Sequence, residues 1–152
     1  MLSLSLLRLI SAYHTWTTEM TPLKTQKYKS EYGFELLRIA EGDYISASAL
    51  FDTGKGRKEN VGYLAQQSIE KSIKAVLCFK EVAIPHTHEL AALIPLIHPT
   101  LNFPYGLEIS DLSYYATVRR YMEGNFDLED EEVKISIEIA ATILTWSRGI
   151  VK

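Results

Sequence analysis

The stretch from Tyr63 to Cys78 contains neither proline nor glycine, and its apolar residues recur at helical rather than strand spacing. It lies within a longer pattern, over residues 58–81, whose apolar and small residues form one wide face. Ile69 and Ile73 widen that face further. Since so wide an apolar surface has to be covered by several neighbours, the sequence predicts a helix at the centre of an all-α bundle.

Four further helices are predicted from apolar residues that recur at spacings of three and four, over residues 25–51, 88–98, 110–122 and 127–151. Thr87 is a predicted N-cap for the second of these helices, which Pro95 distorts. No segment of useful length alternates with the period of two that a half-buried strand requires. We therefore predict an antiparallel up-and-down helical bundle of four to five helices over residues 23–152.

Residues 1–22 form an apolar N-terminal extension, in which a run of leucines ending at Ile10 is interrupted by Arg8. The run is too short to span a bilayer, and no charge precedes it as it would in a secretory signal peptide. Three interpretations stay open: a short helix that packs on the domain or on a partner, a poorly ordered extension, and a membrane-surface anchor, which a single arginine supports weakly. No membrane span is predicted.

The charges of the 152 residues sum to −3, which argues against strong sequence-independent binding to nucleic acid. They are unevenly placed: residues 24–80 hold 10 basic and 7 acidic side chains, whereas residues 81–152 hold 5 basic and 11 acidic ones. Cys78, the only cysteine, excludes an intrachain disulfide and is predicted to be a small buried apolar residue. No metal or cofactor is predicted, and the cytoplasm is the expected location.

The central helix also carries a polar face, because Gln67, Glu70, Lys71 and Lys74 lie three and four residues apart. Glu70 and Lys74 form an i,i+4 pair in the favourable order, which contributes about 0.2–0.5 kcal/mol to helix stability. From the pattern alone, this face is interpreted as a solvated stripe of salt bridges.

Four short motifs, in this order and at these spacings, resemble the HEPN domain family (higher eukaryotes and prokaryotes nucleotide-binding). They are AEGD at residues 40–43, QQSIEKSIKA at 66–75, THEL at 87–90 and RYME at 120–123. The resemblance covers about Tyr32 to Val151. It implies an antiparallel helical bundle that is commonly a homodimer. Many members are encoded beside a small nucleotidyltransferase, and some such pairs act as toxin and antitoxin.

The resemblance also implies a possible activity, since many HEPN proteins are metal-independent ribonucleases with an R-x(4–6)-H motif. In that motif the histidine acts as acid or base on the ribose hydroxyl, and the arginine stabilises charge on the phosphate. All four histidines precede Arg119 and Arg120, and we predict that the local ribonuclease motif is absent from the chain. His88 and Arg120 are the weak catalytic candidates, as a pair that meets only in space or across a dimer interface.

Three functional hypotheses follow. The first is a nucleotide- or RNA-related binding module that acts with a nucleotidyltransferase-type or antitoxin partner. Its cations would contact phosphate and its tyrosine would stack on a base. The second is a ribonuclease that uses the non-local pair, and the third is a non-catalytic dimeric interaction protein. The candidate ligand-binding residues are Gln67, Lys71, Lys74, His88, Arg120 and Tyr121.

Overall fold

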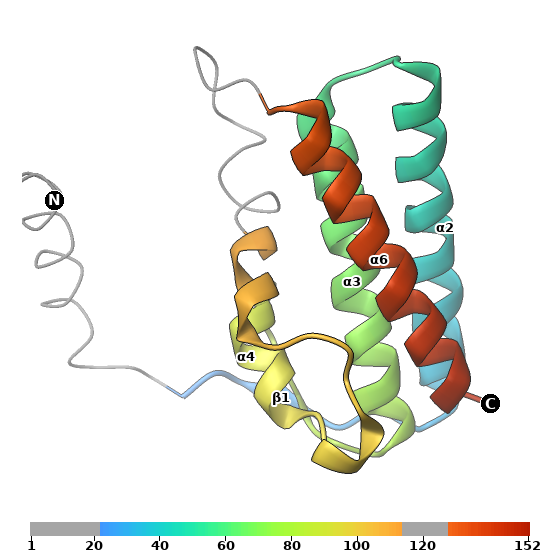
Figure 1. The fold of residues 1–152 in the computed structure, drawn as a ribbon. Coiled ribbons are helices and arrows are strands. Elements are labelled where there is room, and N and C mark those ends of the chain that lie inside the picture. The colour runs from blue at the N-terminus through green and yellow to red at the C-terminus, as the bar shows by residue number, and fades with distance from the viewer. Residues whose placement is uncertain (1–21, 114–127) are drawn as a thin grey trace, which may run out of the picture.

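Three long helices carry the fold in the computed structural model, which describes residues 22–113 and 128–152 (Figure 1). Helices α2 (Tyr32–Thr53) and α3 (Lys58–Phe79) form an antiparallel hairpin. Helix α6 (Asp130–Ile150) packs across both. It runs parallel to α3, because Lys58 and Asp130, near the starts of the two helices, form a salt bridge of 2.8 Å. The predicted all-α helical bundle is confirmed.

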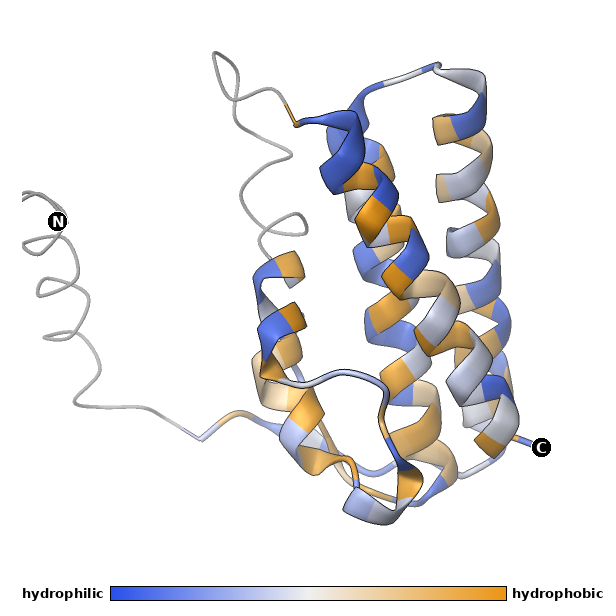
Figure 2. Cartoon of the chain, in the orientation of Figure 1, coloured by the Kyte–Doolittle hydropathy of each residue, from blue (hydrophilic) through white to orange (hydrophobic). Residues whose placement is uncertain are grey.

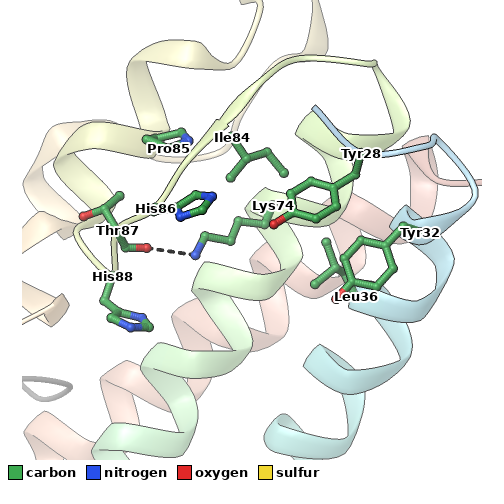
Figure 3. Close-up of a pocket in the computed structure, with 9 residues that line it drawn as sticks. All are labelled: Tyr28, Tyr32, Leu36, Lys74, Ile84, Pro85, His86, Thr87 and His88. Atoms are coloured by element: carbon green, nitrogen blue, oxygen red, sulfur yellow. Dashed lines mark hydrogen bonds between the residues drawn. The ribbon is translucent and has the colours of Figure 1, made fainter. Parts of the chain in front are cut away.

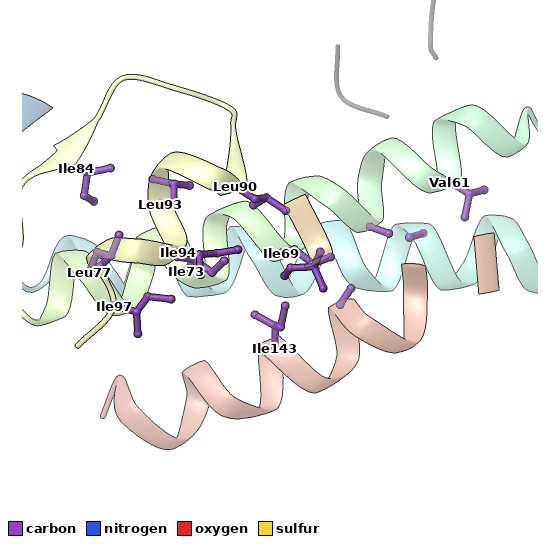
Figure 4. Packing of buried hydrophobic residues seen from close by; sticks show 14 of the residues in the cluster. Val61, Ile69, Ile73, Leu77, Ile84, Leu90, Leu93, Ile94, Ile97 and Ile143 are labelled. Atoms are coloured by element: carbon purple, nitrogen blue, oxygen red, sulfur yellow. The ribbon is translucent and has the colours of Figure 1, made fainter. Parts of the chain in front are cut away.

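Helix α3 is the central element, as its wide apolar face predicts. Fourteen of its 22 residues are buried, whereas α2 buries three and α6 buries six. Ile69 and Ile73 are fully buried and pack in one cluster with Ile143 of α6 and with Leu90 (Figure 4). Each such side chain contributes about 1.5–3 kcal/mol by leaving water.

The ends of the long helices follow local signals. Gly54 ends α2 in the left-handed conformation, with φ of 63°, and its N–H donates to the carbonyl of Phe51. Helix α6 begins three residues after its predicted start, where Glu129 and Glu132 form a capping box. Its first turn is strongly hydrophilic (Figure 2). Within the described residues, no helix is long and apolar enough to cross a membrane.

The predicted helical start at residue 25 is wrong. Strand β1 (Thr25–Gln26) pairs there with strand β2 (Ile84–Pro85), in an antiparallel register that sets Thr25 opposite Pro85. The N–H of His86 extends the ladder by donating to the carbonyl of Lys24 at 2.8 Å. Most of residues 22–31 are polar and exposed, so a helix there would bury little apolar surface.

The predicted helix over residues 88–98 is also shorter than expected. Helix α4 spans only Leu90–Leu93, and the 3₁₀ turns η1 (Ile94–Leu96), η2 (Pro99–Leu101) and η3 (Leu107–Leu112) follow it. Pro95 and Pro99 lack the N–H that a continuing helix requires. The hydroxyl of Thr87 accepts from the N–H of Glu89 at 3.0 Å, so it closes a turn before the helix rather than capping it. The predicted helix over 110–122 lies mostly outside the described residues.

Close contact between α2 and α3 depends on small side chains. Ala40 and Ala47 are fully buried, and the hydroxyl of Ser68 donates to the carbonyl of Ala40 at 2.8 Å. A Cβ atom on Gly33 would lie 2.8 Å from the backbone oxygen of Ala75. That distance is too short for a carbon atom, and backbone cannot rotate away as a side chain can.

We therefore expect Gly33→Ala to lower the free energy of unfolding by about 1–3 kcal/mol, the usual cost of overpacking. Gly42→Ala is the matched control, because nothing lies within 4 Å of its added Cβ. This second change should raise the free energy of unfolding by up to about 1 kcal/mol through helix propensity. Urea denaturation followed by circular dichroism measures both. Equal effects of the same sign would contradict the close approach of the helices at Gly33.

Candidate functional site

The carboxylate of Glu70 is buried in the middle of α3, with 3% of its side chain exposed. It accepts hydrogen bonds from Nζ of Lys74 at 2.7 Å, from Nε2 of Gln66 at 3.1 Å and from Nε2 of Gln67 at 3.3 Å. A buried charge is tolerated only when it is paired and hydrogen-bonded in this way.

The same donors hold a segment that is distant in sequence. Nζ of Lys74 also donates to the carbonyl of Thr87 at 2.8 Å, and Nε2 of Gln66 to the carbonyl of His88 at 3.3 Å. These two carbonyls lie between β2 and α4, where backbone groups lack helical partners and need side-chain ones. We call this network the polar clasp; it consists of Gln66, Gln67, Glu70, Lys74, Thr87 and His88.

The imidazole of His88 is oriented by the clasp and yet remains open to solvent. Its Nδ1 lies 3.1 and 3.3 Å from the two carboxylate oxygens of Glu70, while 70% of the side chain is exposed. An ionised carboxylate only accepts hydrogen bonds, so Nδ1 carries the proton. The other nitrogen, Nε2, is open to a ligand or a proton: it accepts in the neutral imidazole and donates in the imidazolium.

A cavity of about 410 Å³ opens beside the clasp. Tyr28 and Tyr32 lie on one side of it and His86 and His88 on the other, with Lys74 between them (Figure 3). The two tyrosine rings stack with their centroids 5.2 Å apart and their planes 30° apart. The volume falls in the range of about 300–1,000 Å³ that is usual for small-ligand sites.

The structure brings together three of the residues predicted to bind a ligand: Gln67, Lys74 and His88 all contact Glu70. Lys71 lies apart from them and forms an ion pair of 2.5 Å with Asp43 of α2. Arg120 and Tyr121 lie outside the described residues.

The solvated stripe expected on α3 is not what the structure has. The Glu70–Lys74 pair is present, but only 2% of the whole Glu70 residue and 8% of the whole Gln67 residue are exposed. The segment between β2 and α4 covers this part of α3, so the polar side chains face other protein groups instead of water.

Sequence reasoning missed the wall-forming residues Tyr28, Tyr32 and His86. Tyr32, the first residue of α2, is 41% exposed and borders the cavity. A signal was present in the alternation of lysines and tyrosines over residues 24–32. That pattern becomes meaningful only once the β1–β2 pairing places it beside His86.

Two further sequence expectations concern metals and cysteine. Within residues 22–113 and 128–152, no group of three or more His, Cys, Asp or Glu side chains could hold a metal ion. Cys78 is fully buried, as predicted, and its Sγ donates to the carbonyl of Lys29 at 3.2 Å. Burial raises the pKa of this thiol, so it is protonated and unreactive at neutral pH.

The model of the HEPN domain family matches residues 34–150. The chain belongs to the HEPN family. Its fold is similar to the crystal structure of an archaeal HEPN homologue, with a TM-score of 0.60 and 22% sequence identity over 82% of this chain and 99% of that one. At this identity the likeness establishes the fold alone. No curated protein matches the sequence.

The polar clasp lies inside the residues that match the family, and it joins the two motifs QQSIEKSIKA and THEL in space. The prediction that the R-x(4–6)-H spacing is absent from the chain is wrong, because Arg8 and His14 have it. They precede the matched residues and lie outside the described ones.

We expect Glu70→Ala to lower the free energy of unfolding by about 2–4 kcal/mol, because Lys74 and the two glutamines lose a buried acceptor. Glu35→Ala is the control, since Glu35 forms an exposed pair of 2.8 Å with Arg38. Removing that pair should change the free energy of unfolding by no more than about 0.5 kcal/mol. Chemical denaturation of both variants measures the two free energies of unfolding. A Glu70→Ala effect as small as that of the control would show that the clasp does not stabilise the fold.

Proposed function

We propose that this HEPN protein is a nucleotide- or RNA-related binding module whose ligand enters the cavity beside the polar clasp. The supporting observation is the composition of the cavity walls. Stacked tyrosine rings offer an aromatic surface to a base, and two imidazoles face it across a space of about 410 Å³. A base stacks on aromatic rings, and a phosphate is bound by N–H donors and cations.

In this proposal the predicted ligand residues divide into two groups. His88 contacts the ligand through its exposed Nε2. Gln67 and Lys74 position the cavity wall, since their donors already serve Glu70 and Thr87. Arg120 and Tyr121 remain candidate ligand residues. Lys71 remains a weaker candidate, because its ammonium group is already paired with Asp43.

The proposed assembly is a homodimer that acts with a nucleotidyltransferase-type or antitoxin protein in the cytoplasm. Family membership favours pairing of two copies. Exposed large apolar side chains on α2 support a contact surface there, because Phe34, Ile39 and Ile45 are 45%, 41% and 59% exposed. Residues 23–152 form the HEPN-like domain of this proposal, and residues 1–22 are its extension.

Calorimetric titration of the purified chain with nucleoside mono-, di- and triphosphates and with short RNA tests the binding function. We expect His86→Ala to weaken binding about tenfold, the effect of losing one hydrogen bond to a charged group. His98→Ala is the matched control, because His98 borders a different cavity and bonds locally to Thr100. Absence of binding by every ligand, or equal losses in both variants, would contradict the proposal.

A second candidate function is metal-independent ribonuclease activity, and the orientation of His88 by Glu70 favours it. With Nδ1 held by the carboxylate, Nε2 can take the proton from a ribose 2′-hydroxyl and return one to the leaving oxygen. Glu70 would stabilise the imidazolium that forms between these steps. Arg120 is the candidate for stabilising charge on the phosphate.

If this activity exists, the purified protein should cut RNA in the presence of a chelator. His88→Ala should then slow cleavage by about 10²–10⁴-fold, the usual contribution of a general acid–base group. His98→Ala, which changes a histidine outside the cavity, should cut at the wild-type rate. Cleavage at equal rates by wild type and His88→Ala would exclude His88 as the catalytic group.

A further inference from the structure

Residues 24–32 combine positive charge with aromatic rings in one short segment. Lys24, Lys27 and Lys29 are exposed, and the same segment holds one acid, Glu31, together with Tyr28 and Tyr32, whose rings stack on each other. None of the ion pairs formed among the described residues involves these three lysines. In contrast, Lys71 and Lys74 of α3, of which Lys74 lines the cavity, are each paired with an acid.

This segment is continuous with the cavity. The pairing of β1 with β2 and the bond from the N–H of His86 to the carbonyl of Lys24 fix the backbone of this segment beside the histidine wall. The tyrosines form the opposite wall. The three lysines are not among the residues that line the cavity, but Lys27 and Lys29 are the chain neighbours of Tyr28, which does line it.

The position of the lysines bears on the size of the ligand. A free mononucleotide that fills the cavity leaves cations outside the cavity without a phosphate to bind. Neighbouring nucleotides of a strand would supply those phosphates. The base in the cavity has to be unpaired, because a base inside a duplex is stacked and paired on both sides and cannot lie against the tyrosines.

We infer that residues 24–32 and the cavity together bind single-stranded nucleic acid, with one base against Tyr28 and Tyr32 and adjacent phosphates on Lys24, Lys27 and Lys29. Aromatic stacking with backbone neutralisation is the recognised mode of binding single strands with little sequence preference. The inference rests on the proposed function, since the base occupies the same cavity. It adds that the ligand is a strand and places the contacts outside the motifs of α3.

The test is fluorescence anisotropy with a labelled single strand about ten nucleotides long, in RNA and in DNA form. The same sequence as a duplex and a labelled mononucleotide are titrated in parallel. Either single strand should bind about tenfold or more tightly than both the duplex and the mononucleotide. Tyr32→Leu, which keeps the apolar bulk and removes the aromatic ring, should weaken single-strand binding about tenfold.

Salt dependence separates phosphate contacts from stacking. The triple variant Lys24→Gln/Lys27→Gln/Lys29→Gln should reduce the slope of log affinity against log salt by about 2, because each lost phosphate contact on a single strand contributes about 0.7 to that slope. The matched control, Lys55→Gln/Lys134→Gln/Lys152→Gln, makes the same change of net charge on exposed lysines of other elements. It should leave the slope unchanged. Thermal melting verifies that each variant is folded.

Two results would overturn the inference. One is single-strand binding no tighter than mononucleotide binding, and the other is an equal loss of slope in the two triple variants. Either result leaves the proposed function standing as long as the mononucleotide binds. Failure of the mononucleotide and of every strand to bind removes the proposed function as well.

Discussion

A carboxylate inside a helical bundle has to find its compensation in the protein, and Glu70 finds it in α3 itself and in His88. Lys74 and Gln66 neutralise or solvate the charge and, in the same geometry, reach across to the carbonyls of Thr87 and His88. The extended segment between β2 and α4 thereby obtains partners for backbone groups that no helix satisfies. The side chains that compensate the buried charge therefore also fix a stretch of irregular chain, and that stretch carries the histidines of the site.

Much of the fold follows from local patterns in the sequence. The apolar face around Ile69 and Ile73 predicts the central position of α3, and the glycine at position 54 marks the end of α2. The segments that differ are those in which long-range contacts decide. A helix before Tyr32 would have little apolar surface to bury, and pairing with Ile84 satisfies its backbone instead. Such a pairing, across almost 60 residues, leaves no local trace in the sequence.

The site was less accessible to sequence reasoning for a related reason. In the sequence, an i,i+4 pair such as Glu70–Lys74 looks the same whether it lies on an exposed face or under a covering segment. Only the burial of the side chains in the structure distinguishes these two cases. His88 was identified through its motif, but its orientation depends on Glu70, 18 residues away. Tyr28 and His86 belong to none of the four motifs and meet only across the cavity. Family membership therefore identifies the scaffold, and the chemistry of the cavity has to be derived from the contacts.

The short ladder between β1 and β2 has one more consequence. The tyrosine wall of the cavity continues from β1, and the histidine wall continues from β2. The ladder therefore links the two walls to each other, while the polar clasp and the buried side chain of Ile84 tie the histidine wall to the helices beneath. Ile84 belongs both to the ladder and to the main apolar cluster. The width of the cavity is therefore coupled to the packing of the core.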